Sequence, residues 1–140
     1  MMQTLRIFLA CADKRLKLAL LMLLDHQPGM DVAGITDQLL NLEAQINASH
    51  PDVLVIEWQE NLKTIKDQIT NIHSFASPPE IVCMANNPRD KEEILKAGAD
   101  YFIIKNVPPD ELITILKKIQ LKKKDKLDQN QNYSLETSID

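Results

Sequence analysis

The sequence predicts a doubly wound α/β fold, in which five helices cover the two faces of a five-stranded parallel sheet. Short apolar runs alternate with segments of helical periodicity, and turn-forming residues separate them. Strands that alternate with helices in this way form βαβ units and therefore a parallel sheet. The chain of 140 residues is long enough to bury one core without disulfides.

Five short runs are expected to be strands because they are apolar, continuous and bounded by turn residues. They comprise residues 5–10, 31–35, 53–56, 81–84 and 101–104. In such a sheet, ligand or catalytic groups lie just beyond the carboxyl ends of the strands.

Helices are expected between these strands. Asp13 should cap the first helix, Gly98 should end the fourth, and Pro108 and Pro109 should begin the last. The apolar positions span residues 16–24, 39–46, 62–72, 94–95 and 112–119. We expect a domain over residues 1–121 and a polar, disordered tail over residues 122–140, because the apolar periodicity stops from about Asp125.

Composition excludes several classes of protein. The formal net charge of −4 argues against attraction of the whole domain to nucleic acid or to an anionic membrane. Two cysteines cannot build a disulfide framework, and no apolar run approaches the length of a membrane span or of a signal peptide. We therefore expect a cytoplasmic protein that does not contact membranes.

Several segments together resemble the receiver domain of bacterial two-component response regulators, especially the NarL/FixJ type. They are residues 6–10, 13–16, 27–34, 51–57, 96–105 and 109–112, in that order and spacing. The resemblance implies the CheY-like, or flavodoxin-like, strand order 2-1-3-4-5. It also implies a role in two-component or phosphorelay signal transduction.

The resemblance places the phosphorylation site of that family on residues of the wrong chemistry. The two acids that bind magnesium fall on Cys11 and Ala12, and the phospho-accepting aspartate falls on Glu57. Magnesium prefers carboxylate and water oxygens, which neither a thiol nor a methyl group supplies. We therefore expect no magnesium binding and a degenerate pseudo-receiver. The alternative is an atypical phospho-accepting receiver that uses Asp13 and Glu57.

The rest of that site is only partly kept. The switch threonine or serine of the family falls on Cys83, or on Met84 if the loop is one residue shorter, whereas its lysine is kept as Lys105. Glu57 is long enough to reach Lys105. This pair either imitates a permanently modified acceptor or only neutralises two partly buried charges.

The two cysteines suggest a weaker alternative, a small-molecule or redox sensor in a pocket framed by Cys11, Glu57 and Cys83. No histidine is placed to complete a metal site there. In the expected strand order, strand three separates the two cysteines, so we expect no disulfide.

A partner surface is also implied by the resemblance. Receivers dimerise through the fourth helix, the fifth strand and the last helix, which here carry Lys91, Glu92, Tyr101, Lys105, Glu111 and Lys118. Trp58, Tyr101 and Phe102 are expected near the docking surface, where exposed aromatic side chains would serve as anchors, although Phe102 fits the core equally well. The lysines of residues 117–124 are expected to cap the last helix rather than to bind nucleic acid. The roughly 20 polar residues after them are too few for a helix-turn-helix domain, so direct DNA binding is not expected.

The sequence contains no phosphate-binding glycine loop, no dinucleotide fingerprint and no catalytic triad pattern, so we do not expect an enzyme. The function predicted is a phosphorylation-independent interaction module that binds a protein partner of a signalling pathway, or a second copy of itself.

Overall fold

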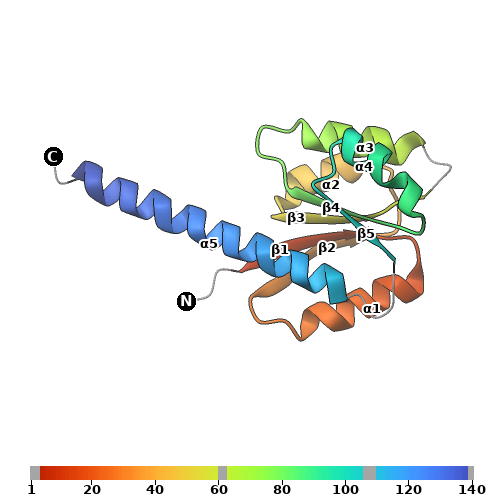
Figure 1. The fold of residues 1–140 in the computed structure, drawn as a ribbon, viewed down its shortest axis with the longest axis horizontal. Helices are drawn as coiled ribbons and strands as arrows, with labels where there is room; N and C mark the ends of the chain where they lie inside the picture. The colour runs from red at the N-terminus through yellow and green to blue at the C-terminus, as the bar shows by residue number, and fades with distance from the viewer. Residues whose placement is uncertain (1–3, 60–62, 106–109, 139–140) are drawn as a thin grey trace.

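A computed structural model describes residues 4–59, 63–105 and 110–138. Strands and helices alternate along the chain as the sequence predicts (Figure 1). The elements are β1 (Leu5–Ala10), α1 (Lys14–Asp25), β2 (Met30–Thr36), α2 (Leu42–Ser49), β3 (Val53–Glu57), α3 (Lys63–His73), β4 (Glu80–Ala85), the 3₁₀ turn η1 (Pro88–Asp90), α4 (Lys91–Ala97), β5 (Tyr101–Ile104) and α5 (Asp110–Ser138).

The five strands form one parallel sheet in the order β2-β1-β3-β4-β5. This confirms the predicted fold class and strand order. Strand β3 lies at the centre of the sheet, and all five of its residues are buried. The carboxyl ends of β1 and β3 therefore lie side by side at one edge of the sheet, with Ala10 in register with Ile56.

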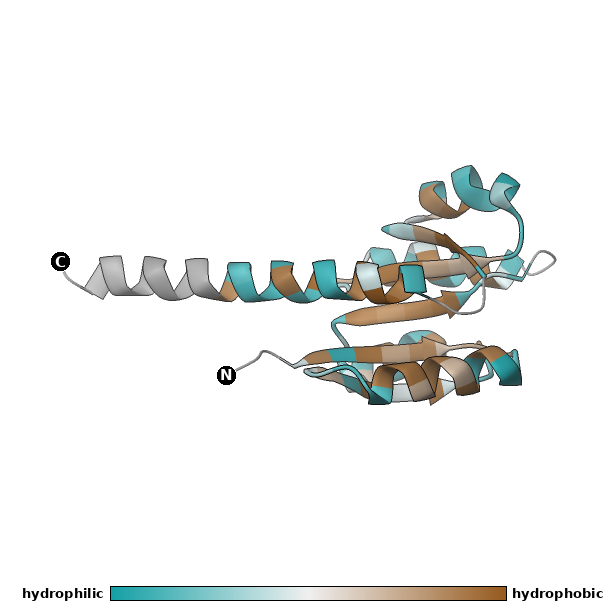
Figure 2. Cartoon of the chain, turned by 60° about the horizontal axis from the view of Figure 1, so that its bottom comes forward, coloured by the Kyte–Doolittle hydropathy of each residue, from teal (hydrophilic) through white to brown (hydrophobic). Residues whose placement is uncertain are grey.

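The sheet separates two hydrophobic clusters, as expected for a doubly wound domain. One cluster joins α1 and α5 to alternate residues of the strands, among them Leu9, Val55 and Met84. The other joins α2, α3 and α4 to the intervening strand residues. Figure 2 shows the strands as predominantly hydrophobic ribbons. Alternation along each strand thus decides which face a side chain enters.

Two predicted helix termini are confirmed. The Asp13 carboxylate accepts hydrogen bonds from the backbone N–H groups of Arg15 and Leu16, at 2.9 Å and 3.2 Å, and so caps α1. Gly98 ends α4 with φ = 124°, a conformation that glycine adopts without strain.

The last helix is much longer than the sequence analysis predicts. Its predicted end near residue 125 is wrong, because α5 continues to Ser138. The segment after Leu121 contains neither glycine nor proline and is rich in lysine, which favours helix even where the apolar periodicity has stopped. The domain boundary at residue 121 stays a prediction.

Smaller differences concern other helix ends. Helix α2 begins at Leu42 rather than at residue 39, since the Leu39 carbonyl accepts the Leu42 N–H in the preceding turn. The predicted positions Leu62, Pro108 and Pro109 lie outside the described residues. Among the helices of the described segments, none is both long enough and apolar enough to cross a membrane.

Strand β2 contains a bulge that makes room for a core side chain. The pairing of β1 with β2 shifts between Ile7 and Phe8, so that Phe8 lies opposite Gly34 and Ala33 is skipped. A Cβ atom at Gly34 would lie 2.5 Å from Cε2 of the Phe8 ring, which is only 3% exposed. Glycine is therefore required here by the close approach of the ring.

We predict that Gly34→Ala lowers the free energy of unfolding by about 1–3 kcal/mol, the usual cost of overpacking a core. Urea denaturation measures the change. Phe8→Leu in the Gly34→Ala background should cost less than the sum of the two single changes, because the smaller side chain relieves the clash. An unchanged urea midpoint for Gly34→Ala would contradict this account of the bulge.

Candidate functional site

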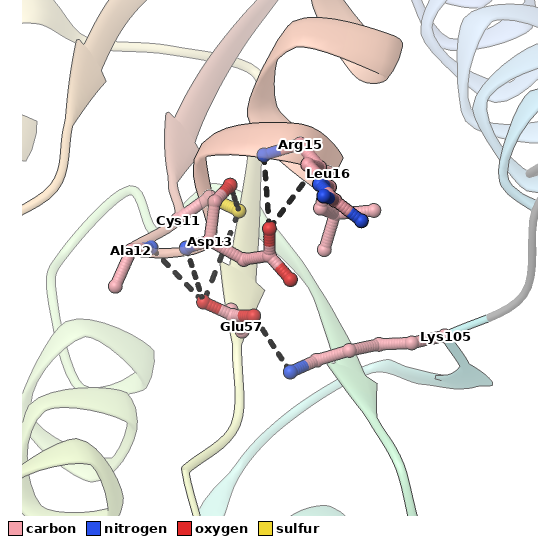
Figure 3. A network of polar contacts seen from close by, with 7 residues as sticks. All are labelled: Cys11, Ala12, Asp13, Arg15, Leu16, Glu57 and Lys105. Carbon is pink, nitrogen blue, oxygen red and sulfur yellow. Dashed lines mark hydrogen bonds and ion pairs between the residues drawn. The ribbon is translucent and has the colours of Figure 1, made fainter.

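Glu57 is the last residue of the central strand β3 and lies at the carboxyl edge of the sheet. It is only 6% exposed and is the one buried charged residue of the described chain. A carboxylate that is removed from water needs partners for both of its oxygens. The surrounding strand ends provide them (Figure 3).

One oxygen of Glu57 is paired with Lys105, as the sequence analysis anticipates. Lys105 follows β5, where its backbone N–H donates to the Ala85 carbonyl at 2.8 Å. Its Nζ atom lies 2.6 Å from Oε2 of Glu57, and the lysine side chain is 15% exposed. The ion pair therefore connects the ends of β3 and β5 across β4.

The other oxygen is held by backbone groups, which the sequence analysis did not predict. Oε1 of Glu57 accepts hydrogen bonds from the N–H groups of Ala12 and Asp13, at 2.9 Å and 3.1 Å. The Cys11 thiol lies 3.9 Å from the same oxygen. These donors belong to the loop between β1 and α1, so the carboxylate also connects β3 to the start of α1.

These contacts set the charge state of Glu57. Burial alone would raise the pKa of its carboxyl group. The hydrogen bond and the charge of Lys105, together with the amides of Asp13 and Ala12, outweigh burial and hold the pKa below its ordinary value. Glu57 is thus an anion near neutral pH.

The nearby Asp13 carboxylate caps helix α1. Its Oδ1 atom is engaged by the first turn of α1, and Figure 3 shows it turned toward Arg15 and Leu16 rather than toward Glu57. The arrangement brings Cys11, the Ala12 and Asp13 amides, Glu57 and Lys105 together. The Asp13 carboxylate serves as the cap of α1.

Among the described residues, Cys11 and Glu57 line one cavity together, and Cys83 is not in its lining. The cavity has a volume of about 240 Å³, and its lining residues are Ala10, Cys11, Ala12, Asp37, Leu39, Glu57, Gln59 and Thr64. Cys83 is absent from this lining, because it is fully buried in the cluster beneath α2, α3 and α4, whereas Cys11 belongs to the cluster of α1 and α5. Both cysteines are free.

The thiols are also poorly suited to reaction. Burial raises the pKa of Cys11 to about 11, with a further contribution from the charge of Glu57. Burial raises the pKa of Cys83 to about 12. A thiol is reactive as the thiolate, so both groups are largely inert near neutral pH.

The surface predicted for partner docking is only partly available. Lys91, Glu92, Glu111 and Lys118 are exposed. Tyr101 is half-buried, and its hydroxyl lies 3.0 Å from Nζ of Lys122. The Lys105 ammonium is already bound to Glu57.

The expectation that Trp58 lies near a docking surface as an exposed anchor is wrong. Trp58 is 6% exposed and packs in the cluster of α2, α3 and α4. The backbone N–H of Trp58 donates to the Met84 carbonyl at 2.7 Å. The side-chain alternation of β3 therefore continues for one more residue and directs the ring inward. Phe102 is half-buried against the same cluster.

Comparisons with known proteins agree with this fold. No protein-family model matches the chain. The curated protein "Probable transcriptional regulator ycf29" from Guillardia theta is 31% identical over 93 residues, which are 66% of this chain, and the chain spans 42% of the length of that relative.

Several solved structures match the fold of this chain. A LuxR-family two-component response regulator from Aurantimonas sp. SI85-9A1 has a TM-score of 0.75 at 17% identity, over 86% of this chain and 87% of that one. The response regulator domain of CheB from Thermotoga maritima scores 0.71 at 21% identity, over 84% and 97%. The signal receiver domain of NarL from Mycobacterium tuberculosis scores 0.74 at 16% identity, also over 84% and 97%.

The chain therefore has the fold of the receiver domains of response regulators. The resemblance noted in the sequence is confirmed at this level. This chain combines the receiver fold with Glu57, Cys11 and Ala12 at the positions where the sequence resemblance places the acidic site.

We predict that Glu57→Gln lowers the free energy of unfolding at pH 7 by about 3 kcal/mol, because it leaves the Lys105 ammonium without a counter-charge in a largely buried position. Since the pKa of Glu57 is lowered by folding, its contribution is complete above about pH 4.3 and is lost as the pH falls through the lowered pKa. The difference between the native protein and the variant should therefore shrink on acidification.

Urea denaturation between pH 7 and pH 3 measures this difference. The matched control is Glu93→Gln, because Glu93 lies 3.6 Å from Lys66 in a pair whose side chains are half exposed. That change should cost less than about 0.5 kcal/mol. If the two substitutions had equal effects that did not change with pH, the buried Glu57–Lys105 pair would contribute no more stability than the exposed pair.

We further predict that neither native thiol reacts appreciably with a thiol reagent at pH 8, because only about a thousandth of Cys11 is thiolate at that pH when its pKa is near 11. The measurement is labelling followed by absorbance, in the native protein and in denaturant. Ser77→Cys, at an exposed position, provides a fast-reacting internal standard. Labelling of Cys11 at the rate of that standard would restore the redox-sensor alternative.

Proposed function

We propose that this chain is a pseudo-receiver: a signalling module that binds a protein partner without being switched by phosphorylation. The observation that carries the proposal is the saturation of the Glu57 carboxylate, one oxygen by two backbone amides and the other by Lys105. The printed names of similar proteins describe response regulators and a transcriptional regulator, which supports a signalling pathway as the setting. The proposal includes no catalytic activity.

The donor set at the site argues against a magnesium ion. The side chains of Cys11 and Ala12 offer a thiol and a methyl group, and the Asp13 carboxylate caps α1. Among the residues onto which the resemblance places the acidic site, Glu57 offers hard oxygens, and these already accept from protein donors. Magnesium favours a nearly octahedral shell of carboxylate and water oxygens, which this set does not supply.

The same contacts disfavour phosphorylation of Glu57. A carboxylate oxygen that attacks a phosphoryl group must be free of competing donors and aligned with the leaving group. Oε1 and Oε2 are both engaged by protein donors, and Cys11 and Ala12 supply no carboxylate for the cation that would neutralise the transferring phosphoryl group. Lys105 alone stands on that side of the carboxylate.

A module of this kind has one resting conformation. The Glu57–Lys105 pair holds the end of β5 against β3, and β5 contributes to the predicted docking surface with α4 and α5. A single carboxylate carries about half the charge of a phosphoryl group. We therefore interpret the Glu57–Lys105 pair as a permanent structural contact. Partner binding then depends on the exposed residues of the docking surface, which are Lys91, Glu92, Glu111 and Lys118.

The chain spans less than half of the length of the transcriptional regulator that it resembles, so we propose gene regulation only for a whole protein of that kind. We also propose a cytoplasmic location. Direct DNA binding is not part of the proposed function.

An amide NMR titration tests the proposal, first with Mg²⁺ and then with beryllofluoride, which mimics a bound phosphoryl group. We predict no saturable shifts at Glu57, Lys105 or Tyr101, because the site has neither a metal shell nor a free acceptor. Saturable shifts that spread from Glu57 to Tyr101 and α5 would show a working switch and overturn the proposal.

A double substitution serves as the positive control. Ala12→Asp with Glu57→Asp returns two carboxylates to the edge of the sheet, and Ala12 is exposed, so the first change buries no new charge. This variant should show Mg²⁺-dependent shifts around residue 12. The control confirms that the titration detects binding under the conditions used.

A further inference from the structure

The positive charge of the chain is concentrated in one part of the last helix, which Figure 1 shows continuing beyond the sheet. Residues 117–126 contain six lysines and one aspartate, a formal charge of +5, whereas the whole chain carries −4, so the remaining residues together carry −9. The sequence analysis expects the lysines of residues 117–124 to cap the helix. That expectation is wrong, because α5 continues to Ser138 and its last turn contains no basic residue.

Two of these lysines contact the strands and show how the helix is turned. Nζ of Lys123 lies 2.8 Å from Oδ2 of Asp52 and donates to the Thr4 carbonyl at 2.8 Å, and these two residues directly precede β3 and β1. Nζ of Lys122 donates to the Tyr101 hydroxyl at 3.0 Å and lies 5.6 Å from the centre of its ring. The side of α5 that carries Lys122 therefore faces β5, the outer strand of the sheet.

Three lysines form a row on that side of the helix. Lys118, Lys122 and Lys126 follow one another at intervals of four residues, so they lie one above the other, with a rise of about 6 Å from each to the next. All three are exposed, and the ion pairs of the described residues include none of them. Like charges at this spacing destabilise a helix, and a bound anion would relieve their repulsion.

We propose that an acidic segment of a protein partner docks along this lysine row, with its carboxylates facing Lys118, Lys122 and Lys126. The inference rests on the proposed function, because it names the chemistry of the partner that the surface of α4, β5 and α5 would bind. Charge complementarity is the reason for the choice. Carboxylates about 6 Å apart match the row, which is the spacing of every fourth residue of a helix or every second residue of a strand.

Acidic residues beside the row favour a short acidic segment over nucleic acid. Glu111 is exposed and lies seven residues before Lys118, on the same side of α5. Glu80 and Asp100 lie near enough to Lys122 for their charges to act on its ammonium group. Duplex DNA carries about one charge every 1.7 Å and would bring phosphates against these carboxylates. A protein segment can place its acids opposite the lysines alone.

Fluorescence anisotropy tests the proposal, with a fluorescein-labelled glutamate-rich peptide as the probe and the full chain as the titrant. We expect saturable binding that weakens as the salt concentration rises, because exposed charges are screened. The triple variant Lys118→Gln, Lys122→Gln and Lys126→Gln should weaken binding by about tenfold, since each exposed ion pair contributes about twofold to threefold. All three lysines are exposed, so folding should be unaffected, and circular dichroism verifies this.

The matched control removes three exposed lysines from other helices, in the triple variant Lys14→Gln, Lys63→Gln and Lys66→Gln. It lowers the net charge by the same amount, so it separates a defined docking surface from attraction by the whole chain. Affinity for the peptide should change by less than about twofold, because charges away from the row are screened. Equal losses in the two triple variants would overturn the proposal, and so would a peptide that does not bind the native chain.

A labelled DNA duplex of similar total charge is the second probe. If the duplex bound more tightly than the peptide and lost its affinity in the α5 triple variant, the row would be a nucleic-acid surface and the proposal would be overturned. Failure of the proposed function is distinguishable, because Mg²⁺ and beryllofluoride act at Glu57 and Lys105. Shifts there with peptide binding that still depends on the row would overturn the proposed function alone. A silent titration without peptide binding would overturn only the acidic partner.

Discussion

The buried carboxylate of Glu57 is the interaction on which the arrangement of the strand ends depends. It lies at the centre of the sheet and accepts from the loop after β1 on one side and from Lys105 after β5 on the other. Removing either set of donors would leave one oxygen of a buried carboxylate without its partners. Three chain segments far apart in sequence are thus held together by a single side chain.

The length of that side chain matters to the chemistry. Glutamate exceeds aspartate by one methylene group, about 1.5 Å, and this reach lets one carboxylate contact both the Ala12 and Asp13 amides and the Lys105 ammonium. A shorter acid at residue 57 would leave space between these donors. The carboxylate of Glu57 thus occupies the amide donors of Ala12 and Asp13, which would otherwise face an anion.

The features that depend on the pattern of side chains could be predicted from the sequence. The contacts that depend on backbone geometry could not. Strands, helix caps and the Glu57–Lys105 contact follow from periodicity and reach. The amide donors of Ala12 and Asp13 carry no side-chain signal. Alternation along β4 could have placed Cys83 away from the Cys11 cluster, because Met84 must then enter that cluster. The length of α5 was missed because a polar helix beyond the sheet shows no apolar period.

Helix α1 is tied to the site through its capping residue. Asp13 donates its backbone N–H to Glu57, and its carboxylate accepts from the backbone of the first turn. The start of α1 is therefore connected to the end of β3 by the same carboxylate that is paired with Lys105 after β5.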